Sequence, residues 1–407
     1  MVEPAPHAPP ADFLYWHRLR HPTIRLARSA VRFALGFDPA PPDERVRAFA
    51  ASYFDADPIA EAYVEEVGLE RGPGAARRWF DASLSGPLPD GAPPSLGALL
   101  EDLKTPPDWL DSDAVERGAR AFRRYGTSVF RFAGAITLQG YRESSVAKPL
   151  ALTGAYSGAS ARRRFLETAQ FWIDVSEPGG LEVGAPGWLA AARVRLMHVF
   201  VRQRILAHPE WDTPRWGLPI NQGDATLTLM GGSFIPGFAL RVMGYWPSVS
   251  EIEAMMHFWR YVGHLMGVRP DWYPADWREA SQLVFVSLLK AAHGAGEDGR
   301  VLSQGYAKAF EPRAPGLRHR LEHRLHLGYT RFFLPASSYR DAGLPPAGIW
   351  ALHPLLQAPF IFAAETARRT MGLDGLADRV ARRARRKWLE RERERPAAFT
   401  AVETMTR

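Results

Sequence analysis

The sequence contains no cysteine, and this absence removes several kinds of chemistry at once. Without a thiol, the 407-residue chain cannot form disulfides, bind an iron–sulfur cluster or hold haem through a thiolate. The sequence also lacks a glycine-rich phosphate loop after a strand and a serine in a nucleophile elbow. Hydrolase and nucleotide-binding functions therefore have no support, and any bound iron would depend on histidine.

Long hydrophobic runs are absent as well. No run of about 18 uncharged apolar residues occurs, so we expect no membrane span. The segment from Phe13 to Phe37 reads as a basic amphipathic helix interrupted by Pro22, without the apolar core of a secretory signal. We therefore expect a cytoplasmic protein.

The chain is basic, with 51 Lys and Arg against 44 Asp and Glu, a net charge of +7. The arginines are scattered through helical segments and do not form one patch with interleaved aromatics, so nucleic acid is not an expected partner. Peripheral contact with an anionic membrane surface agrees better with this charge. A hydrophobic content of 46% is enough for a sizeable core.

Helical periodicity extends nearly throughout the chain and predicts an all-α fold. Expected helices include residues 112–138, 158–175, 187–207, 222–244 and 347–371, and the serine and glutamate of Ser248–Glu251 can cap a helix that begins there. Breaks rich in proline and glycine suggest three parts: an N-terminal helical extension (1–95), a core (96–333) and a C-terminal helical segment packed on the core (334–407).

One helical segment carries a pattern typical of a cofactor site. At about 100° per residue, Arg195, His198 and Arg202 fall within roughly 60° of one another, among apolar neighbours. An imidazole between two guanidinium groups suits haem, because its iron takes a neutral histidine nitrogen and its propionates take arginine forks. A single histidine on an apolar helix is also compatible with a hydrogen-bonded core residue, so this segment alone leaves both interpretations open.

Other segments, taken in order and at these spacings, extend the pattern. They are PPDWLD at 106–111, RRRFLETAQFW at 162–172, RVRLMHVFVR at 193–202, GLPINQGD at 217–224 and FWRYVGHLMGV at 258–268. From about Pro106 to about Val284 the chain thereby resembles the family of latex clearing proteins, which are rubber oxygenases. That family also includes the fungal oxygenase that shortens the farnesyl chain of a mycophenolic acid precursor.

The resemblance implies a globin-like helical core that binds haem b and oxidises a carbon–carbon double bond with dioxygen. It implies that His198 is the axial iron ligand and that Arg195 and Arg202 lie beside the haem. Arg164 and Thr168 would lie on the distal or propionate side. One position departs from the pattern, because Glu167 stands where latex clearing proteins have a lysine that can cap the iron; Glu143 is a candidate for their distal carboxylate.

Three further segments bear on this interpretation, two of them with several histidines and one rich in arginine. Glu253, His257 and His264 fall within about 40° on one helix and present a possible non-haem metal site, although His264 also suits a haem-pocket residue or second axial ligand. The cluster of His319, His323 and His326 is interleaved with charged residues, and residues 382–395 are dense in arginine. Both segments are typical of solvated helix faces.

From the sequence we therefore expect a haem b oxygenase whose substrates are dioxygen and a hydrophobic, unsaturated, isoprenoid-like molecule. Arg164, Glu167 and Thr168 are its expected catalytic residues. Arg195, His198, Arg202 and His264 are expected to bind the cofactor, with His198 on the metal. The alternatives are a non-catalytic haem-binding or sensor protein and a non-haem metal enzyme.

Overall fold

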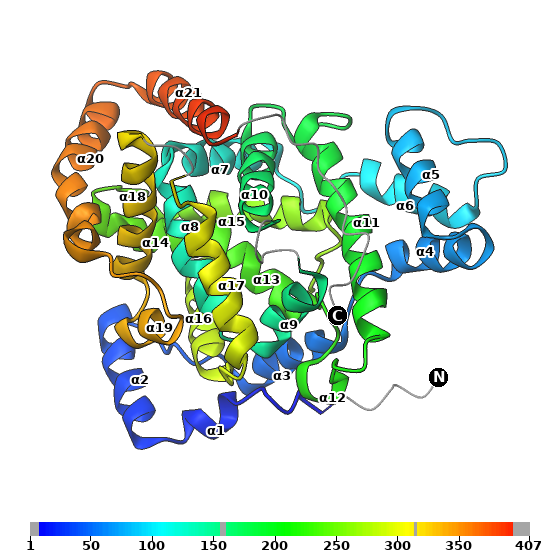
Figure 1. Ribbon diagram of the computed structural model, residues 1–407, viewed down its shortest axis with the longest axis horizontal. Coiled ribbons are helices and arrows are strands. Elements are labelled where there is room, and N and C mark those ends of the chain that lie inside the picture. The colour runs from blue at the N-terminus through cyan, green and yellow to red at the C-terminus, as the bar shows by residue number, and fades with distance from the viewer. Residues whose placement is uncertain (1–7, 155–159, 313–315, 394–407) are drawn as a thin grey trace. The chain divides into compact units, whose positions relative to one another are not determined.

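Every secondary-structure element in the described part of the chain is a helix. The computed structural model describes residues 8–154, 160–312 and 316–393, and Figure 1 shows their course. The all-α prediction is confirmed.

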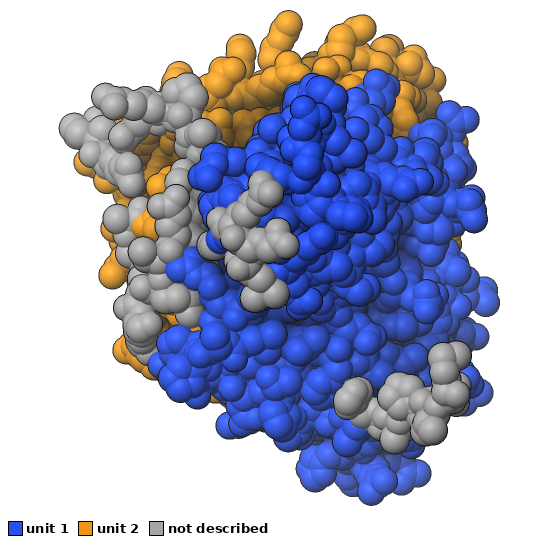
Figure 2. Space-filling view, turned by 90° about the vertical axis from the view of Figure 1, so that its right-hand side faces the viewer, with its two compact units in different colours: residues 1–115, 179–230, 257–292 blue, residues 116–178, 231–256, 293–407 orange. Residues whose placement is uncertain are grey.

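The chain divides into two compact units, each assembled from three stretches of sequence and coloured separately in Figure 2. Unit 1 contains residues 1–115, 179–230 and 257–292, and unit 2 contains residues 116–178, 231–256 and 293–407. These units cut across the three consecutive parts expected from the sequence, because contacts bring distant segments together. The linear division stays a prediction.

Unit 1 contains the helix on which the candidate site is built, α11. Within the unit, α11 packs on α4 and α5, and α4 packs on α6. The elements that lie wholly in unit 1, or nearly so, are α1 (Tyr15–Leu19), α2 (Pro22–Leu35), α3 (Asp43–Ala51), η1 (Ser52–Phe54), α4 (Pro58–Arg71), α5 (Pro73–Ser85), α6 (Pro94–Lys104), α11 (Pro186–Leu206), α12 (Thr213–Trp216), α13 (Gln222–Gly232) and α16 (Trp277–Lys290).

Unit 2 is built around α18, which packs on α8, on α20 and on η3. The elements that lie wholly or mostly in unit 2 are α7 (Ser112–Arg124), α8 (Ser128–Gly140), α9 (Ser144–Thr153), α10 (Ser160–Ser176), α14 (Phe234–Ala239), η2 (Leu240–Met243), α17 (Gly296–Ala309), α18 (Leu317–Phe333), α19 (Ala336–Asp341), η3 (Gly348–Leu352), α20 (His353–Thr370) and α21 (Asp374–Glu392). Helix α15 (Val249–Leu265) contributes its two halves to different units.

The ends of several helices follow from their local sequence. At the start of α15, Ser248 Oγ accepts a hydrogen bond from the backbone nitrogen of Glu251 at 3.1 Å. Glu251 Oε2 in turn accepts one from the backbone nitrogen of Ser248 at 2.8 Å. This is the capping box that the sequence predicts, and it satisfies two backbone donors that have no partner within the helix.

Two expected helices are broken by single residues. The helix expected at 112–138 divides into α7 and α8 at Gly126, whose φ of +55° lies in the left-handed region that favours glycine. The helix expected at 222–244 divides at Ser233, which has a non-helical conformation. Pro236 explains this break. Proline has no backbone N–H, so it cannot donate the helical hydrogen bond to the carbonyl oxygen four residues earlier.

One stretch of helix, Gln222–Met243, is long and apolar enough to cross a membrane by length and composition alone. Core helices pass the same test, and 56% of the most apolar window is buried. The break at Ser233 divides this stretch into α13, α14 and η2.

Candidate functional site

Helix α11 carries His198 and is firmly fixed in unit 1. Its first residue is Pro186, which suits a helix start because the first turn needs no backbone donor there. The indole of Trp188 is fully buried, and its Nε1 donates to the carbonyl oxygen of Leu103 at 3.3 Å. The helix predicted at 187–207 is confirmed.

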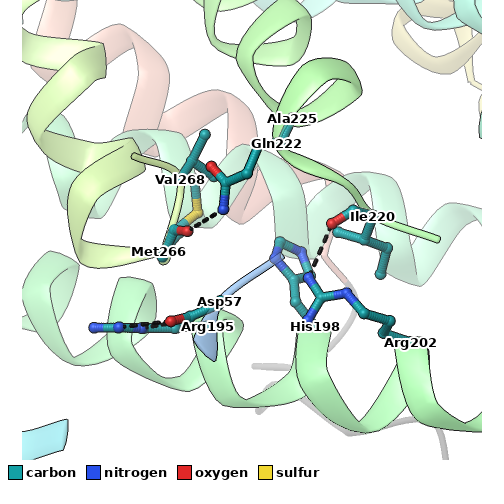
Figure 3. Close-up of a pocket in the computed structure, with 10 residues that line it drawn as sticks. Asp57, Arg195, His198, Arg202, Ile220, Gln222, Ala225, Met266 and Val268 are labelled. Carbon is teal, nitrogen blue, oxygen red and sulfur yellow. Dashed lines mark hydrogen bonds and ion pairs between the residues drawn. The ribbon is translucent and has the colours of Figure 1, made fainter. Parts of the chain in front are cut away.

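His198 borders a small hollow within unit 1 (Figure 3). Its ring rises from α11 between the Arg195–Asp57 pair on one side and Arg202 with Ile220 on the other. The cavity volume of this hollow is about 10 Å³, which is close to what one water molecule requires. The hollow beside His198 therefore has no room for haem in this conformation, and only the chemistry of its imidazole supports His198 as a haem ligand.

The imidazole of His198 is neutral and has no hydrogen-bond partner among the described residues. Burial, followed by the charge of Arg202, lowers the pKa of His198 to about 4, although Asp57 opposes the shift. No hydrogen bond or ion pair of His198 exists among the described residues. A neutral imidazole with an unshared nitrogen is the form that coordinates iron, so the chemistry of this donor fits an axial haem ligand.

Arg195 is held by carboxylates of the protein itself. Its Nε and one terminal nitrogen donate to the two oxygens of Asp57 at 2.6 and 2.8 Å. The other terminal nitrogen donates to Asp102 Oδ2 at 2.6 Å. Only 1% of Arg195 is exposed, so these are bonds in a desolvated environment, where a bidentate fork is strongest.

Asp102 connects this arginine to a second one, Arg269, whose terminal nitrogens lie 2.5 and 2.6 Å from its two carboxylate oxygens. Burial acts to raise the pKa of Asp102, but hydrogen bonds from Arg269 and Arg195 outweigh it and hold the pKa below its usual value. Two carboxylates and two guanidinium groups thus form a neutral cluster, which we call the Asp–Arg cluster: Asp57, Asp102, Arg195 and Arg269.

Arg202 holds the turn that leads into α13. Its Nε donates to the carbonyl oxygen of Pro219 at 3.0 Å, and a terminal nitrogen donates to that of Ile220 at 2.9 Å. Its remaining terminal nitrogen pairs with Glu61 at 2.7 Å. Ile220 has a φ of +53°, which is unusual for a β-branched residue, and Arg202 stabilises this strained backbone from within.

These contacts bear on the expected role of the two arginines. Arg195 and Arg202 lie on the same face as His198, as the spacing predicts, but the donors expected to anchor propionates already hold Asp57, Asp102, Glu61 and two carbonyl oxygens. A propionate would have to displace one of these acceptors. The anchoring of propionates by Arg195 and Arg202 therefore stays a prediction. The guanidinium nitrogens that it would use already donate to acceptors of the protein.

Two residues complete the packing around the Asp–Arg cluster. Gly267 has a φ of +79°, and a Cβ atom there would lie 2.1 Å from Asp57 Oδ2 and 3.1 Å from Arg195 Nε, so only glycine fits. Gln222 Nε2 donates to the carbonyl oxygens of Ala56 and Gly267 at 2.6 and 2.8 Å. The amide of Gln222 thereby ties the start of α13 to both sides of the cluster.

His264 lies near this cluster and is 9% exposed. Its Nε2 is buried without a hydrogen-bond partner. Burial, then Arg269, lowers its pKa to about 4, although Asp102 opposes the shift. The ring packs edge-on against Trp109, with centroids 5.7 Å apart. A neutral, unpartnered imidazole is compatible with a cofactor pocket, and no described contact assigns His264 to one.

The alternative non-haem metal site lacks its ligands. Among residues 8–154, 160–312 and 316–393, no three His, Asp or Glu side chains are grouped to hold a metal ion. The Nε2 of His257 instead accepts a hydrogen bond from the backbone nitrogen of Asp111 at 3.0 Å. The shared helix face of Glu253, His257 and His264 therefore does not become a metal centre.

The three expected catalytic residues lie together on α10 in unit 2. Arg164 and Glu167 are both buried and form an ion pair of 2.8 Å, and Thr168 Oγ1 donates to the carbonyl oxygen of Arg164 at 3.0 Å. The carboxylate that replaces the expected lysine thus pairs with the guanidinium one turn earlier. Glu143 is the N-cap residue of α9, and its proposed catalytic role stays a prediction.

Two segments expected to be solvated are partly buried. His326 is 1% exposed, because α18 packs on α8 and α17, and its Nδ1 lies 2.9 Å from the hydroxyl of Tyr306. Arg385 in α21 is fully buried and donates to Ser176 Oγ at 2.9 Å. The prediction that these segments are solvated was wrong for His326 and Arg385. Their charged composition does not show that one face of each helix packs against the core.

Sequence reasoning missed the residues that surround His198 from other elements. These residues lie outside α11 in the sequence, and only the folding of the chain brings them to His198: Asp57, Asp102, Gln222 and Gly267. The GLPINQGD motif contained the one available signal, since Gln222 and the strained Ile220 belong to it.

Comparison with known proteins gives three findings. Residues 120–391 match the family model of the "ER-bound oxygenase mpaB/B'/Rubber oxygenase, catalytic domain". The rubber oxygenase of Streptomyces sp. (strain K30) is 26% identical over 235 residues, which are 56% of this chain and 56% of that protein. The chain thus spans little more than half the length of this relative.

The solved structure of latex clearing protein LCP in the closed state is similar in fold. The TM-score is 0.65 at 19% identity, and the match covers 83% of this chain and 91% of that one. The family match extends beyond the resemblance noted in the sequence, to the end of α21, and it covers more than half of the chain. The protein therefore belongs to the mpaB/B' and rubber oxygenase catalytic-domain family.

Proposed function

We propose that this protein is a haem b-dependent oxygenase that uses dioxygen to oxidise a hydrophobic, unsaturated, isoprenoid-like substrate, including by cleavage of a carbon–carbon double bond. Family membership supports the oxygenase part of the proposal. The observation that carries the haem part is His198, a neutral and uncommitted imidazole on the buried face of α11.

In this proposal His198 would hold the haem iron through its imidazole, and bound haem would supply the iron that activates dioxygen. The contribution of the chain is to keep that imidazole neutral and in place. Arg195 fixes α11 one turn before His198 through Asp57 and Asp102, and Arg202 fixes it one turn after through Glu61 and Ile220. Rotation of α11 would break the six polar contacts of Arg195 and Arg202, so the face of α11 that carries His198 is fixed.

On α10, Arg164 and Thr168 are proposed to lie on the distal or propionate side. The ion pair with Glu167 neutralises Arg164, and Thr168 is held against the backbone of its own helix. A carboxylate at Glu167 offers no neutral amine, so this chain cannot use the distal lysine of latex clearing proteins. The cytoplasmic location expected from the sequence remains a prediction.

The first experiment measures haem binding. Purified wild-type protein is expected to show a Soret band and a pyridine haemochrome typical of haem b, and His198→Gly is expected to lose the haem while keeping its far-ultraviolet circular dichroism. Added imidazole should restore haem binding to the glycine variant, because it refills the ligand position. His208→Gly, just beyond the end of α11, is the matched control and should bind haem like the wild type.

Full haem occupancy in His198→Gly without imidazole would remove His198 as the ligand. A colourless wild type produced with adequate haem would remove the haem proposal altogether. Oxygen consumption with squalene, together with detection of carbonyl products, then separates an oxygenase from a haem-binding protein without catalytic activity. Haem occupancy without consumption of oxygen across several unsaturated isoprenoids would favour the non-catalytic alternative.

A further inference from the structure

Unit 2 presents a stretch of helix whose apolar side chains face outward. Between Asp341 and Glu365 no Asp, Glu, Lys or Arg occurs, although η3 and most of α20 fall in this interval. Ile349, Leu356 and Phe360 are 75%, 63% and 78% exposed. We call the exposed apolar side chains of this stretch the α20 face: Ile349, Leu352, Leu355, Leu356, Phe360 and Phe362.

The α20 face is not the result of a loosely attached helix. Leu352, Leu356 and Phe360 recur every four residues, which places them on one side of the helix. The other side is anchored in unit 2, where α20 packs on α18 and η2, and Gln357 donates to the hydroxyl of Tyr329 at 2.8 Å. Figure 1 shows α20 beside α18 and joined to α21. The outward direction of the apolar side chains is therefore fixed by the fold.

The chain continues from this face into an amphipathic stripe on α21. Leu376 and Val380 are 49% and 60% exposed, and Arg379 and Arg383 lie beside them at helical spacing. Neither arginine makes a hydrogen bond or ion pair with any described residue. Two unpaired cations thus lie beside the exposed Leu376 and Val380 on α21, the helix that packs on α20.

Nearby carboxylates do not balance these cations, because other arginines already hold them. Glu365 pairs with Arg124 at 3.1 Å, and Asp374 pairs with Arg368. Asp378 pairs with the buried Arg123 at 2.6 Å. The free charge of the surface formed by α20 and the first half of α21 is therefore positive.

Charge decides between the two simplest occupants of such a face. In a symmetric dimer the same surface meets itself, so the unpaired arginines of both copies would be brought together. An anionic bilayer instead accepts the apolar side chains among its acyl chains and the guanidinium groups among its phosphates. We propose that the α20 face, with Arg379 and Arg383, is a docking surface for anionic lipid membranes, an inference independent of the haem proposal.

Sedimentation with vesicles tests this proposal on the full chain. Vesicles of phosphatidylcholine with one quarter phosphatidylglycerol should bind the protein about tenfold more strongly than vesicles of phosphatidylcholine alone. Leu356→Glu combined with Phe360→Glu should reduce binding to both kinds by at least about tenfold, since it places charge in the apolar contact. Leu317→Glu, at an 83% exposed position of α18, is the matched control and should bind as the wild type does.

A second variant tests the electrostatic part. Arg379→Gln with Arg383→Gln should lower binding to the anionic vesicles by about tenfold and leave binding to the neutral vesicles unchanged. Far-ultraviolet circular dichroism and melting temperature verify that each variant is folded.

Wild-type protein that binds neither kind of vesicle would overturn the proposal, as would a folded Glu variant that binds like the wild type. A wild-type dimer in light scattering that becomes a monomer on Leu356→Glu with Phe360→Glu, without any vesicle binding, would assign the face to a second copy of the chain. Equal binding of wild type and Gln variant to anionic vesicles would remove the role of the arginines.

Discussion

Two helices of this protein reverse the usual distribution of side chains, in opposite directions. On α11 two arginines, Arg195 and Arg202, point inward, and Arg195 is 1% exposed within a cluster of carboxylates. On α20 the large apolar side chains point outward, and Phe360 is 78% exposed. A buried charge needs an oppositely charged or hydrogen-bonding partner within the folded chain. An exposed apolar side chain has no such partner and can be buried by another molecule that binds to it. The first helix is thus fixed by internal contacts, and the second is available for an external one.

The comparison predicts that the largest loss of stability follows from removing a charge on α11. Arg195→Met leaves Asp57 buried without its partner and should lower the free energy of unfolding by about 3–5 kcal/mol. Arg193→Met is the control, because the Arg193–Asp81 pair is largely exposed and such pairs contribute about 0–1 kcal/mol. Urea unfolding of both variants gives the two values. Equal and small losses would mean that the Asp–Arg cluster does not hold α11.

A smaller loss is expected from crowding the same cluster. Gly267→Ala places a Cβ against the Asp57 carboxylate and should cost roughly 3 kcal/mol. Gly184→Ala is a matched control, since Gly184 has a similar φ of +84° and open space around its Cβ position. The control should cost about 1 kcal/mol, for the left-handed conformation alone. Thermal unfolding that fails to separate the two variants would contradict the tight packing around Asp57.

The pH dependence of stability tests the burial of His264. Its folded pKa of about 4 lies below the ordinary 6.5, so between these values the unfolded chain binds a proton that the folded chain does not. Stability should therefore fall as the pH decreases from 6.5 to 4. His264→Phe removes the contribution of His264 and leaves that of His198, whose folded pKa is also about 4. The two curves should therefore diverge as the pH falls, by about 3 kcal/mol at pH 4.

The measurement is urea unfolding of the haem-free protein at several pH values. His208→Phe, a substitution in the partly exposed turn after α11, serves as the control and should keep the wild-type dependence. Parallel curves for wild type and His264→Phe would show that His264 is solvated in the folded state.

The smallest effect is expected on α20. Phe360→Ser should change the free energy of unfolding by less than about 0.5 kcal/mol, because an exposed ring contributes little to the core. Leu325→Ala in α18, at a position only 6% exposed, should cost about 2–5 kcal/mol. A loss of several kcal/mol from Phe360→Ser would show that part of the chain covers the α20 face in solution.

Local sequence explains the helices well and their breaks less well. Pro186 and the capping box at Ser248 mark helix starts that the structure confirms. The breaks at Gly126 and Ser233 were not predicted, because apolar periodicity continues across them and a single backbone conformation interrupts the helix. His326 and Arg385 were misassigned to solvent for a related reason, since composition does not reveal which face of a charged helix packs inward.

The sequence by itself determined the all-α class, the placement of His198 between two arginines on one face of α11, and the family to which the chain belongs, because these depend on residue type and helical spacing. Only the tertiary structure decided what those arginines hold. Asp57, Asp102 and Glu61 reach them from other helices, and such long-range pairing depends on how the chain folds back on itself. Folding likewise decided that the apolar side chains of α20 face outward, because a helical pattern specifies an apolar side without specifying what will cover it.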